Sequence, residues 1–216
     1  MISEVGKVKS QLPMNVQSEI DRVSRYGQQL EALLAQKKFP ISGDRDALIV
    51  GYWSLLLDYH TAIVMLLPKE LYGAAFALMR PIVEAWVRVH VVKMGSDDTV
   101  LEIKNDSYKV RFDRVGEEID KAFGLDFFAK SLKKSVRDAL HSYTHSGSFQ
   151  IARRFDENEI KSRYSDGAIL NVIEASTTAV FMATIVVAKH FGFEEEWRAT
   201  SEMFHEYNRR PTEVPE

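Results

Sequence analysis

Apolar side chains recur every three or four residues through much of the chain, which is the spacing that gathers them on one face of an α-helix. In the first such segment, 15–37, charged residues fill the opposite face, and we predict a first helix there. Its apolar positions are Val16, Ile20, Val23, Leu30, Leu33 and Leu34.

Two further segments are apolar around nearly their whole circumference. The first of these segments, 47–67, follows a candidate N-cap at Asp44 and ends before Pro68. The other segment is 68–94, and Pro68 suits the first turn of a helix there. Helices that are apolar on all sides belong in the centre of a bundle. We therefore expect these two helices to lie at the centre.

The remaining segments also favour helices. We predict them at 99–123, 126–131, 133–145, 168–190 and 193–208, with Ser165-Asp166 capping the fourth. Residues 149–164 are expected to be irregular, with one helical turn near 157–161.

Alternating apolar and polar runs of the kind that strands show do not stand out. The predicted fold is therefore all-α: an elongated antiparallel helical bundle with about five long helices plus short ones, and no sheet. We expect one domain over 14–208, an N-terminal arm over 1–13 and a C-terminal tail over 209–216.

Composition narrows the possible functions. The 216 residues include 28 Lys and Arg against 31 Asp and Glu, for a net charge of −3, and no Cys. This excludes disulfides, Cys-ligated metals and thiol nucleophiles, and it disfavours a globally basic nucleic-acid binder. Glycine-rich dinucleotide and phosphate loops are absent, so we expect no cofactor and see no DNA-specific motif. The most apolar run, Ala179–Ala188, is too short to span a bilayer, which predicts a cytoplasmic protein.

A polar stripe interrupts the second apolar helix. Arg80, Glu84 and Arg88 stand four residues apart and share one face, and Pro81 should kink the helix by leaving the Ala77 carbonyl without its donor. One interpretation is an ion network that fixes the packing of the bundle. The other is a pocket in which Arg80 binds a phosphate or carboxylate and Glu84 orients it.

Other helices offer charged partners for this stripe. Asp58 lies in the only polar cluster of its helix after Ser54 and could pair with Arg80 or Arg88. Asn171 and Glu174, in the long helix 168–190, could face the same polar seam.

The densest chemistry lies between Arg137 and Gly147. His141 and His145 are four residues apart and share a helical face, which suits a metal pair only weakly because Ser142 replaces the glutamate of a zincin motif. A metal-independent nucleolytic role is an alternative, since His and Arg can serve a hydroxyl nucleophile and a phosphate near neutral pH. The third interpretation is structural: the histidines cap the last carbonyls of a helix.

These residues resemble the HEPN superfamily of compact helical bundles. His141-Ser142-Tyr143 matches the His-x-Tyr part of its motif, whereas Arg137 precedes His141 at a shorter separation than the motif has. The elements Arg80-Pro81-x-x-Glu84 and Thr144-His145-x-Gly147 are also similar to an uncharacterised bacterial family with HEPN-like helices. The resemblance implies a bacterial homodimer, and many of its members are ribonucleases in toxin–antitoxin and phage-defence systems.

Two hypotheses follow for function. In the first, the protein acts on RNA without a metal ion, through a polar pocket. Its catalytic candidates are His141, His145, Arg80 and Glu84, and its ligand-binding candidates are Arg88, Tyr143, Arg153, Arg154 and Asp58. In the second, the protein is a non-catalytic helical binding or dimerisation module in which the same residues stabilise the bundle.

Overall fold

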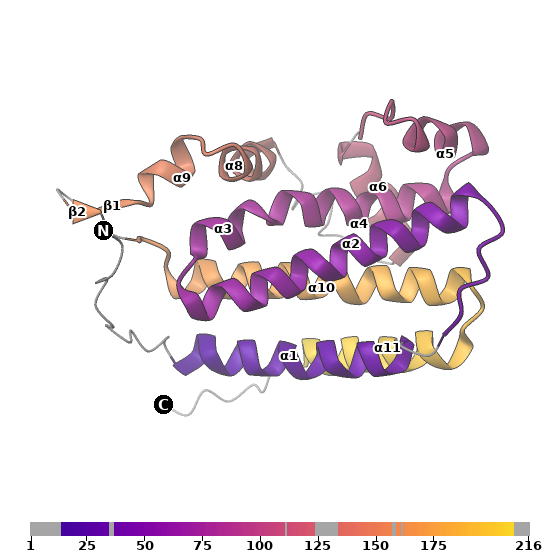
Figure 1. The fold of residues 1–216 in the computed structure, drawn as a ribbon, viewed down its shortest axis with the longest axis horizontal. Helices are drawn as coiled ribbons and strands as arrows, with labels where there is room; N and C mark the ends of the chain where they lie inside the picture. The colour runs from indigo at the N-terminus through magenta and orange to yellow at the C-terminus, as the bar shows by residue number, and fades with distance from the viewer. Residues whose placement is uncertain are drawn as a thin grey trace, which may run out of the picture.

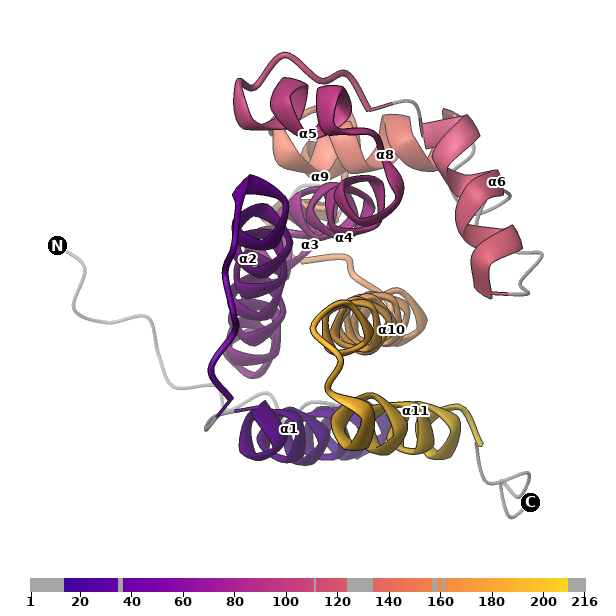
Figure 2. The same ribbon diagram turned by 90° about the vertical axis from the view of Figure 1, so that its right-hand side faces the viewer.

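Helix α10 (Asp166–His190) runs through the middle of the structure because its side chains are apolar on nearly all sides. In the end view of Figure 2 it lies between α2 (Asp44–Leu66) and α4 (Met79–Met94) on one side and α1 (Met14–Leu34) and α11 (Glu194–Asn208) on the other. All four helices pack against it. Burying this apolar surface is the main favourable contribution to folding.

The computed structural model describes residues 14–34, 37–110, 112–123, 134–156, 159–160 and 162–209. The predicted arm, the short helix at 126–131 and nearly all of the tail lie outside these residues. The all-α fold is confirmed, with five long helices of 15 to 25 residues that run along one axis (Figure 1). The Ser165 hydroxyl caps α10 as predicted, accepting from the Ala168 amide at 3.3 Å.

Polar groups inside the core are paired. The Trp53 indole donates to the Thr184 hydroxyl at 3.0 Å, and that hydroxyl donates to the Val180 carbonyl at 2.8 Å. His60 is only 7% exposed, and its Nδ1 lies 3.0 Å from the Ser176 hydroxyl oxygen. Hydrogen bonds of this kind remove the penalty of burying polar groups.

Helix α2 is not central, contrary to the prediction. It buries one stripe, which contains Ile49, Trp53, Leu56, His60 and Ile63. Its other face stays exposed: Leu55 is 42% and Met65 is 59% exposed. The centre is taken by α10, which four helices already cover.

By length and composition alone, the segment Asp44–Lys69 and helix α10 could each cross a membrane. The apolar window of α10 is 67% buried inside the bundle, as expected of a core helix, whereas that of the first segment is only 28% buried. The exposed apolar face of α2 is therefore the feature that needs explanation.

The single helix predicted over 68–94 is divided. Pro68 lies in a 3-10 turn, η1 (Leu67–Lys69), and Glu70 then adopts a left-handed conformation, with φ of 57°. Helix α3 (Tyr72–Ala77) follows and is separated from α4 at Leu78. This break agrees with the predicted kink, because Pro81 cannot donate to the Ala77 carbonyl.

Two other predictions need correction. The helix expected over 99–123 is two helices, α5 (Asp97–Lys104) and α6 (Phe112–Phe123), because Asp106 adopts φ of 53° and the Ser107 amide and hydroxyl bind the Glu102 carbonyl. Of the helical turn predicted near 157–161, residues 157, 158 and 161 lie outside the described residues, and 159–160 form a strand. This strand, β2 (Glu159–Ile160), pairs antiparallel with β1 (Phe155–Asp156). Helix α9 (Ser148–Ala152) precedes them.

Helix α8 (Lys134–Thr144) is joined to the α3–α4 break by one side chain. The Thr144 hydroxyl lies 3.2 Å from the Ala77 carbonyl and 3.0 Å from the Leu140 carbonyl, and it shares its proton between them. It thus replaces the donor that Pro81 lacks.

The Thr144 hydroxyl and Pro81 should therefore be energetically coupled. We expect Thr144→Val to lower the free energy of unfolding by about 1 kcal/mol, and by less in a Pro81→Ala background, where an amide can serve the Ala77 carbonyl. Urea unfolding of wild type, the two single variants and the double variant measures this coupling. Thr178→Val is the matched control for the Thr-to-Val change. Additive effects would contradict it.

The burial of His60 should make stability depend on pH. Burial lowers the pKa of its imidazole from 6.5 to about 4. Between these values the unfolded chain binds a proton that the folded chain does not, so stability falls as the pH falls. Between pH 7 and 4.5 we expect wild type to lose about 2–3 kcal/mol more than His60→Phe in urea unfolding. The exposed-site control His205→Phe should behave as wild type, and equal losses in all three proteins would refute the assignment.

Candidate functional site

The polar stripe of α4 forms one ion network. The Glu84 carboxylate lies between two guanidinium groups, with Oε1 at 2.9 Å from Arg80 Nε and Oε2 at 3.3 Å from Arg88 Nη1. The three side chains keep 31% (Arg80), 26% (Glu84) and 23% (Arg88) of their surface exposed. The network therefore lies at the surface, where a ligand can reach it, and not within the core.

Helix α8 brings the histidine pair to this network. His141 and His145 are both exposed, and their rings lie 4.4 Å apart between centroids at an angle of 51°. Arg80 Nη1 is in hydrogen-bond contact with His141 Nδ1. Because a guanidinium can only donate, Nδ1 of His141 must accept, and the ring proton of the neutral imidazole is then on Nε2.

Arg80 lies between two hollows in the surface. The larger, a groove of about 420 Å³, is formed by α2, α4 and the end of α8. Its lining residues are Tyr52, Leu55, Tyr59, Arg80, Pro81, Glu84, Ala85, Arg88, Thr144 and His145. The smaller hollow, of about 220 Å³, is lined by residues that include Arg80, Arg137 and His141. The four residues predicted to be catalytic are therefore brought together at one accessible place.

Aromatic side chains form the α2 wall of the groove. The Arg88 guanidinium lies 5.7 Å from the centroid of the Tyr52 ring, within the range of a cation–π interaction. Burial raises the pKa of the Tyr52 hydroxyl, so this group is protonated at neutral pH. Tyr52 was not predicted from the sequence. Its separation from Tyr59 by seven residues, two helical turns, is the signal that could have found it.

Several predicted ligand-binding residues lie elsewhere. Tyr143 is only 8% exposed and packs on Phe76, with ring centroids 5.3 Å apart, so it contributes to the core. Asp58 is exposed on α2 and forms no ion pair with Arg80 or Arg88; within the described residues, Glu84 pairs with both.

Arg153 and Arg154 lie near the start of α3. Arg153 donates to the Arg163 carbonyl at 3.2 Å and lies 5.3 Å from the Tyr164 ring centroid. The Arg154 guanidinium packs so closely on Gly73 that a Cβ there would overlap with it. Neither arginine lines either hollow, and the lining residues of both include none from α10, so Asn171 and Glu174 are not part of the two hollows.

The arrangement can bind an anion and exchange protons. Two guanidinium groups share one carboxylate, and the His141 imidazole contacts Arg80 next to them. Because the cationic groups outnumber the carboxylate, the site favours a phosphate over a cation. Among the residues that the structure describes, no group of three or more His, Cys, Asp or Glu side chains is placed to hold a metal ion.

Comparisons with protein-family models, with curated proteins and with solved structures found no match to this chain. The resemblance to the HEPN superfamily therefore stays a prediction, and the function has to be argued from the groove itself.

Proposed function

We propose that the groove between α2, α4 and α8 binds the phosphodiester backbone of single-stranded RNA and cleaves it without a metal ion. The observation that carries this proposal is that Arg80 and Glu84 of α4 meet His145 at one accessible groove, while His141, whose ring lies against that of His145, contacts Arg80 from the adjoining smaller hollow. This convergence favours the RNA hypothesis over a purely structural role, in which each residue would be buried with a different partner.

Each wall of the groove suits one part of such a substrate. The guanidinium groups of Arg80 and Arg88 are ligands for the phosphate, and Glu84 holds both of them in place. Across the groove, Tyr52 and Tyr59 offer aromatic rings on which unpaired bases stack.

RNA supplies its own nucleophile, the 2′-hydroxyl, so the reaction needs a base and a charge stabiliser but no metal-activated water. His145 accepts the 2′-hydroxyl proton as O2′ bonds to phosphorus and, as imidazolium, delivers that proton to O5′ when the P–O5′ bond breaks. The products are a 2′,3′-cyclic phosphate and a 5′-hydroxyl. Arg80 and the Nε2–H of His141 stabilise the negative charge that develops on the phosphate oxygens.

A ribonuclease of this kind would agree with the resemblance of the sequence to the HEPN superfamily. A HEPN-like protein of this kind would serve a bacterial toxin–antitoxin or phage-defence system in the cytoplasm. The groove and the short elements at 80–84 and 144–147 support this assignment.

Cleavage of RNA by purified protein tests the reaction. We expect wild type to cleave single-stranded RNA in the presence of a chelator, to leave the DNA oligonucleotide of the same sequence intact, and to yield 2′,3′-cyclic phosphate ends. His145→Ala should lose at least about 100-fold in rate, while the exposed-histidine control His205→Ala keeps wild-type activity. Equal cleavage by all three proteins, or none by any, would exclude catalysis by this groove, and loss of cleavage with chelator would exclude the metal-independent mechanism.

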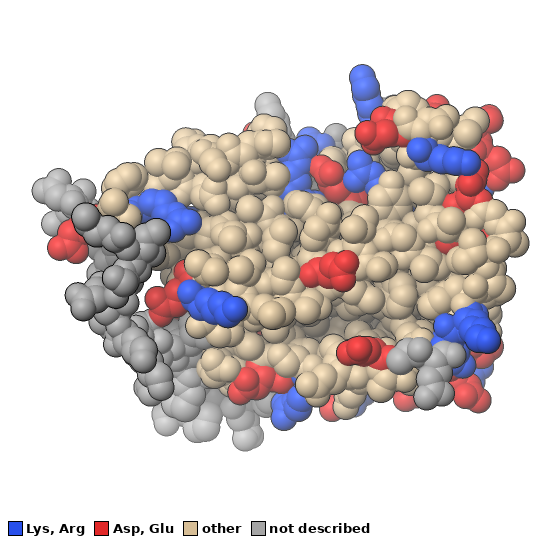
Figure 3. Space-filling model, viewed as in Figure 1, with Lys and Arg blue, Asp and Glu red and all other residues tan. Residues whose placement is uncertain are grey.

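We also propose that a second copy of the chain covers the outward face of α2 and borders the groove, which Leu55 also lines. This face is apolar and exposed at Leu55 and Met65, and Figure 3 shows that few charged side chains interrupt it. The exposed carboxylate of Asp58 on the same helix disfavours insertion into a bilayer. Apolar surface of this kind is typical of an interface between proteins.

Light scattering coupled to size exclusion tests this interface. We expect wild type to elute with the mass of a dimer and Leu55→Lys with the mass of a monomer, because the interface would then have to take a charged ammonium group out of water. Leu101→Lys, at a leucine of α5 that is 53% exposed, should remain a dimer. A monomeric wild type, or a dimeric Leu55→Lys, would refute the proposal.

A further inference from the structure

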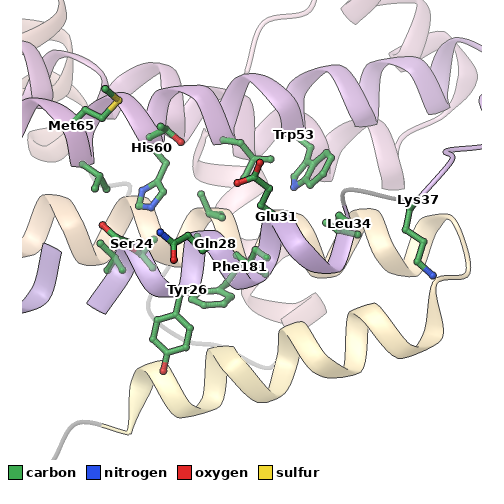
Figure 4. Close-up of a pocket in the computed structure, with 18 of the residues that line it drawn as sticks. Ser24, Tyr26, Gln28, Glu31, Leu34, Lys37, Trp53, His60, Met65 and Phe181 are labelled. Carbon is green, nitrogen blue, oxygen red and sulfur yellow. The ribbon is translucent and has the colours of Figure 1, made fainter. Parts of the chain in front are cut away.

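A cavity larger than the groove lies away from it. It has a volume of about 760 Å³, it is formed by α1, α2 and α10, and it shares no lining residue with the groove (Figure 4). Helix α1 packs against α10 and α11, while α2 packs against α4 and α10, so the two helices reach α10 from different sides. The space between them has the size of a small-molecule site.

The cavity walls are mainly apolar. Leu30, Leu57, Val64 and Val180 line its length. Phe39 and Trp53, with ring centroids 5.6 Å apart, lie towards the turn between α10 and α11. Along α2 the lining runs from Trp53 to Met65, which is about 18 Å at the rise of an α-helix. An extended alkyl chain fits this length and this polarity.

His60 places one polar atom in the apolar wall. It extends from α2 towards α1 (Figure 4) and is 7% exposed. The Ser176 hydroxyl donates to the Ile173 carbonyl at 3.0 Å, so it accepts the hydrogen bond from His60 Nδ1. Burial lowers the pKa of His60 and keeps the ring neutral. Nε2 therefore carries a lone pair, and no described residue donates to it, so a ligand with a hydrogen-bond donor can bind there.

The charges around the cavity exclude an anionic ligand. Lys37, the one lysine or arginine among the lining residues, is paired with Glu196. The carboxylate of Glu31 lies on the α1 side and adds a negative charge to the rim (Figure 4). A carboxylate or phosphate headgroup would have no free cation here, whereas a hydroxyl needs none.

We infer that this cavity is a binding site for a neutral aliphatic alcohol, whose alkyl chain lies between α1 and α2 and whose hydroxyl donates to His60 Nε2. The inference is independent of the proposed reaction on RNA, because the two sites share no residue.

Three ligands of similar length, 1-decanol, 1-methoxynonane and decanoate, test the hydrogen bond to His60 Nε2. Their affinities for the full-length protein are measured by isothermal titration calorimetry at pH 8. We expect 1-decanol to bind about five- to tenfold more tightly than its isomer 1-methoxynonane, which lacks the donor, because one net hydrogen bond is worth about that factor. Decanoate should bind more weakly than 1-decanol. Equal affinities for the two isomers, or tighter binding of decanoate, would overturn the inference.

Two variants test the location. A Cβ at Gly27, on the cavity wall, meets no atom within 4 Å, and the same holds for Gly51, which lies on α2 outside the cavity lining. Both Gly27→Leu and Gly51→Leu should stay folded, since leucine favours a helix more than glycine does. We expect Gly27→Leu to lose at least tenfold in affinity for 1-decanol and Gly51→Leu to bind as wild type. Unchanged affinity in Gly27→Leu would place the ligand elsewhere and refute the site.

A third variant tests the acceptor. His60→Phe keeps an aromatic ring but removes Nε2, so it should bind 1-decanol and 1-methoxynonane with equal affinity. A preference for 1-decanol that persists in a folded His60→Phe protein, as judged by circular dichroism, would show that His60 is not the acceptor.

Discussion

The burial of α10 is the constraint on which the rest of this structure depends. A helix of 25 residues that is apolar on nearly every side cannot face water, and it therefore requires neighbours around its whole circumference. Helices α1, α2, α4 and α11 meet this requirement. The few polar side chains that α10 carries into the core, Ser176, Thr177 and Thr184, donate to carbonyls of their own helix and so need no partner from elsewhere.

This constraint explains both unusual surfaces of the molecule. Because α1 and α2 are each held by α10, neither has to pack closely on the other, and the space between them remains as a cavity. Because α2 buries only one stripe in the core, its opposite face is left uncovered, with Leu55 and Met65 exposed on it. A helix with apolar side chains all round thus serves the core with one face and leaves the others available for ligands or for a second chain.

Periodicity predicted the helices well and their arrangement poorly. Four of the five long helices were located to within a few residues, because an apolar stripe is a local property of the sequence; the fifth, α4, begins eleven residues later than predicted. Which helix lies at the centre is not local: segments 47–67 and 168–190 look alike, and only packing places the second inside. The divisions at Glu70 and Asp106 depend on single left-handed residues, which carry no strong composition signal at glutamate and aspartate.

The site was predictable where chemistry coincided with helical spacing. Arg80, Glu84 and Arg88 were found because four-residue spacing puts them on one face, and the histidine pair for the same reason. Tyr143, Arg153 and Arg154 were assigned by proximity to the histidines in sequence, and Asp58 as a polar residue of a mostly apolar helix. None of the four lines either hollow. The sequence does not say which face of α8 meets α4.

The α3–α4 break has a consequence for how the groove is assembled. The Thr144 hydroxyl binds the Ala77 carbonyl that Pro81 leaves open, and the next residue along the chain, His145, lines the groove. Because Pro81 has no amide proton, the Ala77 carbonyl is left open for Thr144 of α8 to bind. This contact holds α8 against α4 and so sets the position of the His145 imidazole relative to Arg80. A residue that is usually regarded as a helix breaker works here as a positioning device between two helices.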